Sequence, residues 1–188
     1  MRISERFLYQ QNEPEPVRSG AIFAVFFSLG LLTSVSAHGG GSTTGLEPSI
    51  TTGQTLLISL VGGVAAFQLT TAIITVRSEM LSPLMAGLAA YTGIMHLLLG
   101  MEDSLLLLGG FGVLGLLAVL TFFELPPQRE RLAVLALCVV VVCMFVGYFL
   151  NNHDAHMVLE DRLGLTAKIS ELLVLGLAFR SIRSSSTE

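Results

Sequence analysis

Residues 132–150 read LAVLALCVVVVCMFVGYFL and contain no charged side chain. A helix crosses the roughly 30 Å of bilayer hydrocarbon in about 20 residues, so this run is long enough to span a membrane. Lipid offers the backbone no hydrogen bonds, so a spanning segment must be a helix or belong to a closed barrel. Barrel strands alternate polar and apolar residues, whereas Val139–Val142 is uninterrupted valine. The run therefore predicts a transmembrane helix.

Further apolar runs with few charges lie on both sides of this helix. The whole chain is 52% hydrophobic and only 13% charged, whereas a soluble domain is about 25% charged. The net charge of -4 argues against nucleic acid as a partner. We predict an all-α, polytopic transmembrane helix bundle over residues 20–180. Its six spans are 20–37, 55–76, 83–100, 104–123, 132–150 and 163–179.

The two ends of the chain are polar and lie outside this bundle. Residues 1–19 predict a flexible cytoplasmic arm, and residues 181–188 predict a disordered cytoplasmic tail. The apolar run at 21–35, followed by Val35-Ser36-Ala37, also fits the core and cleavage site of a signal peptide, which would leave five spans. The leader before this run is long and holds three glutamates, whereas a signal peptide begins short and basic. This favours a retained first helix.

The basic residues predict the orientation of the bundle. Cytoplasmic loops of membrane proteins carry an excess of Lys and Arg. With six spans, eight arginines fall on one side, and Arg162 alone falls on the other. We therefore expect a multi-pass protein of the cell membrane with both termini in the cytoplasm. The eight arginines are Arg2, Arg6, Arg18, Arg77, Arg129, Arg131, Arg180 and Arg183.

The four histidines all fall at or near the predicted outer face. His153 and His156 are spaced i, i+3 and flank Asp154, so one helical turn would bring them together. Imidazole and carboxylate are ligands for zinc, copper or iron. One hypothesis from the sequence is therefore a metal site at His153, Asp154 and His156, with His38 as a further ligand. A second hypothesis is a haem b whose axial ligands are His96 and one of the two loop histidines. The competing interpretation is a solvated loop, because no strict metal-binding spacing is present.

Three polar residues within the predicted spans form a candidate intramembrane cluster. Lys168 and Glu171 share one face of the last span at i, i+3, and His96 lies at similar depth on the third. A charge at that depth costs a few kcal/mol unless it is paired or hydrated. The cluster could form a polar pocket open to the outside or an ion pair that locks the helix packing. Lys168 could instead extend toward the outer surface.

Short motifs in the second half of the chain point to one group of proteins. They are TGIMHL at 92–97, LLLGGFG at 106–112, and Lys168 in the last span. In these motifs, residues 86–180 resemble a group of small haloarchaeal membrane proteins with four spans and no assigned function. Ala167 replaces the acid that precedes the lysine in that group, and Glu171 is the candidate to supply the charge instead. The resemblance implies an archaeal plasma membrane and a four-helix unit, and it implies no activity.

No sequence motif identifies an enzyme: GxSxG, P-loop and Rossmann fingerprints do not occur. Three hypotheses follow. The first is a non-catalytic accessory or scaffold subunit, with the bilayer and other membrane subunits or further copies as partners. It is favoured by 19 glycines, which let membrane helices approach closely. The second is a metal- or haem-binding protein that uses His96, His153 and His156. The third is a small transporter or channel gated through His96, Lys168 and Glu171.

Overall fold

The computed structural model describes residues 50–74, 80–100, 104–151 and 161–185, and the regular secondary structure within them is entirely helical. This confirms the predicted all-α class for those residues. The predicted arm at 1–19, the span at 20–37 and the signal-peptide alternative lie outside them. The described helices are α3 (Thr52–Ile74), α4 (Pro83–Leu99), α5 (Ser104–Phe122), α6 (Pro127–Asn151) and α8 (Arg162–Ser184).

Within the described ranges, three helices are long and apolar enough to cross a membrane: α3, α5 and α6. They fit an integral membrane protein, as the sequence predicts. Helix α4 is apolar but only 17 residues long, and α8 carries the charges of Lys168 and Glu171 within its length. Six spans therefore remain a prediction, and three spans meet the criteria of length and composition.

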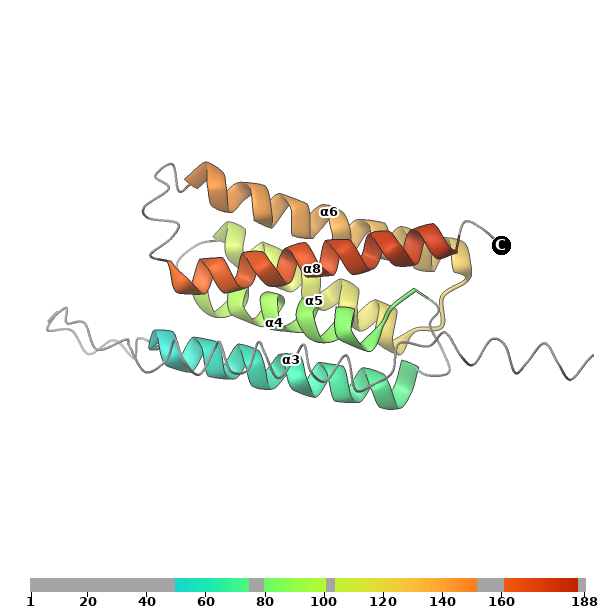
Figure 1. Ribbon diagram of the computed structural model, residues 1–188, viewed down its shortest axis with the longest axis horizontal. Coiled ribbons are helices and arrows are strands. Elements are labelled where there is room, and N and C mark those ends of the chain that lie inside the picture. Colours follow the sequence, from blue (N-terminus) through green and yellow to red (C-terminus); the bar gives the residue numbers. More distant parts are fainter. Residues whose placement is uncertain (1–49, 75–79, 101–103, 152–160, 186–188) are drawn as a thin grey trace, which may run out of the picture.

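Helix α4 lies at the centre of the bundle and packs against α3, α5 and α8. Helix α5 also packs against α6, and α6 packs against α8, so α4, α5, α6 and α8 form a closed four-helix ring. Helix α3 lies outside this ring against α4. Figure 1 shows that successive helices run in opposite directions. The ring brings α4 and α8 side by side although more than 60 residues separate them along the chain.

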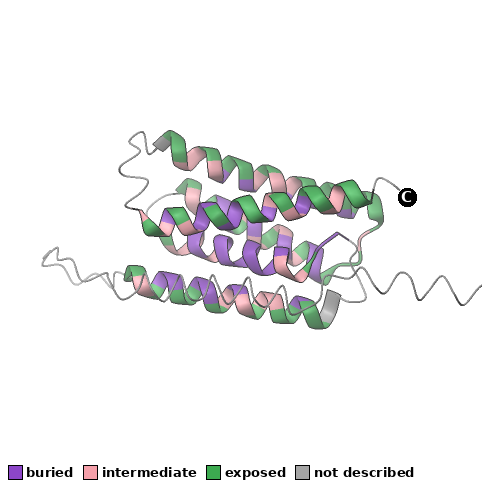
Figure 2. Ribbon diagram, in the orientation of Figure 1, coloured by how far each residue is buried: buried purple, intermediate pink, exposed green. Residues whose placement is uncertain are grey.

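The central position of α4 follows from its small residues. Its buried face includes Ala86, Gly87, Ala89, Ala90 and Gly93, and Figure 2 shows it as the most continuously buried helix. A Cβ added to Gly63 of α3 would lie 2.9 Å from the Gly87 carbonyl oxygen. Helices at this separation need glycine at the contact, because any side chain would hold the backbones apart.

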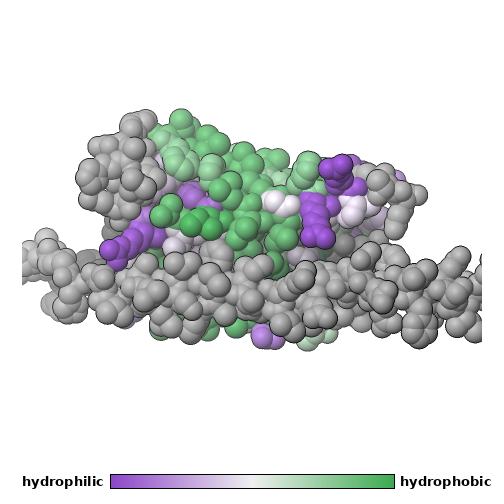
Figure 3. Space-filling view, viewed as in Figure 1, coloured by the Kyte–Doolittle hydropathy of each residue, from purple (hydrophilic) through white to green (hydrophobic). Residues whose placement is uncertain are grey.

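The outward faces of the bundle are apolar. Figure 3 shows a hydrophobic surface across the middle of one face, with hydrophilic patches near both ends. Solvent would disfavour so much exposed leucine, valine and phenylalanine, whereas lipid accommodates it without cost. The surface thus agrees with insertion in a membrane. On α6 the exposed large residues are Leu132, Leu135, Val139, Val142, Val146, Phe149 and Leu150.

Two helices extend beyond their predicted limits at the arginine-rich end of the bundle. Helix α6 begins at Pro127, five residues earlier than the predicted span, because proline is well tolerated in a first turn. Helix α8 continues to Ser184, into the predicted tail. Both extensions hold the segment before α4: the Met80 amide donates to Glu130 at 3.0 Å, and Ser181 donates to the Met80 carbonyl at 2.8 Å. The ends of α6 and α8 are thereby tied to α4.

We expect Ser181→Ala to lower the free energy of unfolding by about 1 kcal/mol, because the Met80 carbonyl loses its hydroxyl donor. Ser185→Ala is the matched control, since the exposed Ser185 hydroxyl donates only within its own helix, to the Ile182 carbonyl. The measurement is thermal unfolding of the detergent-solubilised protein. Equal melting temperatures for the two variants would show that Ser181 does not hold the segment.

Candidate functional site

A buried ion pair lies inside the four-helix ring. The Lys168 ammonium is 2.8 Å from Glu171 Oε1 and 2.7 Å from Oε2, within one turn of α8. Both residues are almost fully buried, with Lys168 4% exposed and Glu171 0%. Lys168 therefore does not extend toward the outer surface, which was one of the options left open by the sequence. It is held inside because the carboxylate replaces the hydration that the ammonium loses.

Two neighbouring helices complete the hydrogen bonds of this pair. The Lys168 ammonium donates to the Met144 carbonyl of α6 at 3.1 Å. Together with the two carboxylate oxygens, this contact uses all three hydrogens of the ammonium group. Thr92 of α4 donates its hydroxyl to Glu171 Oε1 at 3.3 Å. The pair thus joins three of the four helices of the ring.

The His96 imidazole, in the last turn of α4, lies beside the same carboxylate. Its Nδ1 is 2.8 Å from the Thr92 carbonyl oxygen. A carbonyl only accepts, so Nδ1 carries the hydrogen. Its Nε2 faces Glu171 Oε1 at 3.4 Å. In the neutral ring these two atoms are both acceptors, and a proton between them would form a charge-assisted hydrogen bond. Glu171 therefore contacts both Lys168 and His96.

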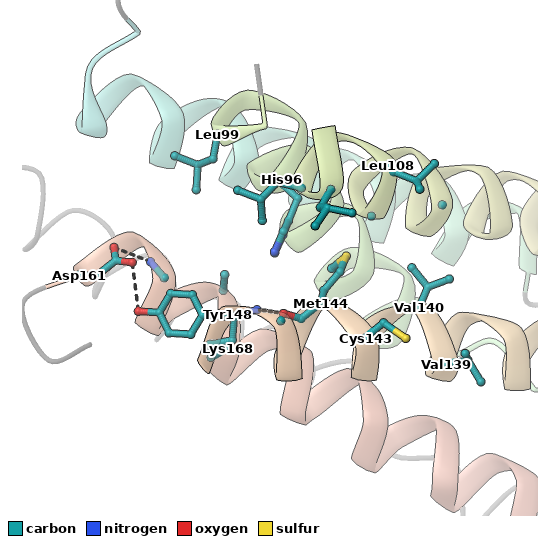
Figure 4. A pocket seen from close by; sticks show the side chains of 17 residues that line it. His96, Leu99, Leu108, Val139, Val140, Cys143, Met144, Tyr148, Asp161 and Lys168 are labelled. Atoms are coloured by element: carbon teal, nitrogen blue, oxygen red, sulfur yellow. Dashed lines mark hydrogen bonds between the residues drawn. The ribbon is translucent and has the colours of Figure 1, made fainter. Parts of the chain in front are cut away.

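A cavity of about 660 Å³ lies among α4, α5, α6 and α8, next to this cluster. Its size falls within the ~300–1,000 Å³ range of small-molecule sites. Figure 4 shows His96 reaching toward the cavity from α4, and Lys168 bonded to Met144 on its far side. Most of the wall is apolar, and of the glycines in it only Gly147 has no atom within 4 Å of an added Cβ. The apolar lining includes Leu99, Leu105, Leu106, Leu108, Val139, Val140 and Met144.

The cavity has one polar end, formed where α8 begins. Asp161 caps α8 by accepting the Gly164 amide at 2.9 Å, as short acidic side chains do at a helix start. Its other oxygen accepts the Tyr148 hydroxyl of α6 at 3.0 Å (Figure 4). A Cβ at Gly164 would lie 2.6 Å from the Tyr148 ring, so only glycine allows this contact. The sequence alone assigns neither Asp161 nor Tyr148 to a site, although an aspartate directly before an apolar helical run favours a helix cap.

The predicted metal ligands His38, His153, Asp154 and His156 lie outside the described ranges. Within those ranges, no three His, Cys, Asp or Glu residues are grouped so that they could hold a metal ion. Cys138 and Cys143, which also lie in the described part, are free thiols.

Comparison with known proteins gives no match: no family model, no curated protein and no solved structure is similar to this chain. The haloarchaeal resemblance of residues 86–180 stays a prediction. Function is therefore inferred from the geometry of the four-helix ring.

Proposed function

We propose that this integral membrane protein binds a small amphipathic molecule in the cavity between α4, α5, α6 and α8, as the binding step of a small transporter. The observation that carries the proposal is the cavity, with about 660 Å³ of space, a single polar end, and apolar walls that open to the outer face of the bundle at Leu105, Leu108 and Val139. A ligand with an apolar body and one polar group would match both parts of the lining. The predicted location in the cell membrane, with both termini cytoplasmic, is part of this proposal.

The packing around the cavity supports a binding role over a purely structural one. Protein interiors are normally filled to the density of organic crystals, and the contacts of α4 with α3 and α5 follow that rule through glycine. At one glycine of the cavity wall, Gly147, the effect is the opposite. A Cβ at Gly147 would meet no atom within 4 Å, although Gly147 lies in the cavity wall. The α6 backbone thus leaves space that no neighbouring side chain fills.

We expect Gly147→Leu to abolish ligand binding while leaving the fold intact, because the new side chain occupies the cavity without meeting a neighbour at its Cβ. The measurement is the rise in melting temperature that amphipathic probes produce, since a ligand that binds only the folded state stabilises it. About 100-fold excess of probe over Kd corresponds to about 2.7 kcal/mol of stabilisation. The native protein should show such a rise and Gly147→Leu should show none.

Gly176→Leu is the matched control for this experiment. Gly176 is exposed on α8, a Cβ added to it would meet no atom within 4 Å, and it is not part of the cavity lining. The same substitution there should leave the probe effect unchanged. If both variants retain the native response, the probes bind elsewhere and the proposed function is wrong.

An accessory or scaffold subunit of a membrane assembly is the second candidate. Gly115 of α5 and Gly176 of α8 are exposed and have open space beside them, which suits close approach of a partner helix. Another membrane protein or a second copy of the chain could occupy that space. Mild extraction from native membranes, followed by measurement of the particle mass, tests this role. A monomer without a partner would contradict it.

A further inference from the structure

The hydrogen bonds that Lys168 already makes limit the charge that a ligand of the cavity can carry. Lys168 is the cation of the lining, and its three hydrogens are already donated to Glu171 Oε1, Glu171 Oε2 and the Met144 carbonyl. An anionic ligand would have to break the bond to Glu171 and leave that carboxylate buried without its partner. Leaving one member of a buried ion pair without its partner is strongly unfavourable. Lys168 therefore does not make the cavity selective for anions.

Asp161 contributes the charge that is left over. Lys168 and Glu171 form a direct ion pair at 2.7 Å, whereas Asp161 interacts with Lys168 only at longer range and has no basic side chain in ion-pair contact among the described residues. The next residue, Arg162, is exposed. Asp161 does accept two hydrogen bonds, from the Gly164 amide and the Tyr148 hydroxyl; both donors are uncharged, and the start of α8 offsets only part of the full charge of the carboxylate. With a neutral His96, the side chains of Lys168, Glu171 and Asp161 sum to one negative charge in the described part of the chain around the cavity.

The positions of these groups also fix the orientation of a ligand. Asp161 lies at the start of α8, whereas the apolar wall continues along α6 from Tyr148 to Val139. Nine helical steps separate Val139 from Tyr148, which corresponds to about 14 Å of helix. Resting on the proposed function, we infer that the ligand is an amphipathic cation: its amine or ammonium head lies against the Asp161 carboxylate, and its apolar body extends along α6 between Gly112 and Gly147.

Three probes with the same decyl chain test this inference: decylammonium, decyl sulfate and decanol. Each is added, below its micelle concentration, to the full chain in a neutral detergent, and Kd is derived from the rise in melting temperature. The cation should bind the native protein about tenfold or more tightly than the other two, because a charge-assisted contact exceeds a neutral one by about 1.4 kcal/mol or more. Equal binding of the three probes, or tighter binding of the sulfate, would overturn the inference.

Asp161→Asn isolates the charge, because asparagine is as good a helix cap as aspartate and retains an oxygen for the Gly164 amide. This substitution should weaken binding of the cation until its Kd is about that of decanol, and the Kd of decanol should stay unchanged. Glu124→Gln removes the same charge at the opposite end of the bundle and should leave the Kd of each probe unchanged. A cation preference that survives Asp161→Asn would overturn the inference. If no probe stabilises the native protein, the proposed function is wrong as well. If the probes bind without a preference for charge, the inference is wrong and the proposed function is retained.

Discussion

Replacing Lys168 with methionine, or Glu171 with leucine, is expected to lower the free energy of unfolding by about 3–5 kcal/mol, because either change leaves one buried charge without its partner. The double substitution should recover most of this loss, since an apolar pair of similar volume is often as stable as a buried ion pair. Melting temperatures of the two single variants and the double variant in detergent measure the coupling. A loss in the double variant equal to the sum of the single losses would show that the charges do not meet.

The neighbours of the pair predict which single variant is the more harmful. Glu171→Leu leaves the ammonium with the neutral Met144 carbonyl as its remaining acceptor. It also removes the acceptor of the Thr92 hydroxyl and the partner of His96 Nε2. Lys168→Met strands the carboxylate, which still has Thr92 as a donor, and leaves the Met144 carbonyl without the ammonium. We expect the Glu171 variant to be the less stable of the two.

His96→Leu is the matched neutral control in the same cluster. It removes the contact of Nε2 with Glu171 at 3.4 Å and the bond from Nδ1 to the Thr92 carbonyl, and it leaves the Lys168–Glu171 pair intact. Its cost should be nearer 1 kcal/mol, roughly the usual net value of a hydrogen bond. A loss as large as that of the single charge variants would mean that His96 carries part of the buried charge.

Hydropathy predicts the existence of the helices better than their arrangement. The apolar runs of α3, α5 and α6 stand out because lipid-facing and buried positions are both hydrophobic. The same property hides which helix is central, since every face is apolar. The position of α4 follows from small residues such as Ala86, Gly87 and Ala90 on its buried face, which a hydropathy profile does not distinguish from other apolar residues.

The local part of the candidate site is readable from sequence, and the rest is not. The i, i+3 spacing puts Lys168 and Glu171 on one face of α8, and their charged groups are 2.7 Å apart in the structure. The approach of His96 depends on α4 and α8 being neighbours, which is a property of the ring. The cavity depends on the packing of four helices, and of the glycines in its wall only Gly147 of α6 has open space beside it. Asp161 lies in a segment whose composition is that of a solvated loop, and only its contact with Tyr148 places it at the cavity.

The contact between α4 and α5 allows a graded test of how tightly the ring is closed. A Cβ at Gly110 of α5 would lie 2.8 Å from the Gly93 carbonyl oxygen, which is backbone and cannot move without separating the helices. We expect Gly110→Ala to cost about 1–3 kcal/mol, as overpacking usually does. Thermal unfolding in detergent measures this cost.

Two further glycine variants make the series decisive. A Cβ at Gly93 of α4 would lie 2.9 Å from Leu114, whose side chain can adopt another rotamer, so Gly93→Ala should cost less than Gly110→Ala. Gly115 of α5 has nothing within 4 Å, so Gly115→Ala should be neutral or stabilise by up to about 1 kcal/mol, because alanine favours helix more than glycine does. The expected order of stability is therefore Gly115→Ala, then Gly93→Ala, then Gly110→Ala. Equal losses at Gly110 and Gly115 would show that α4 and α5 are not in backbone contact, and the ring that encloses the cavity would then be looser than the distances indicate.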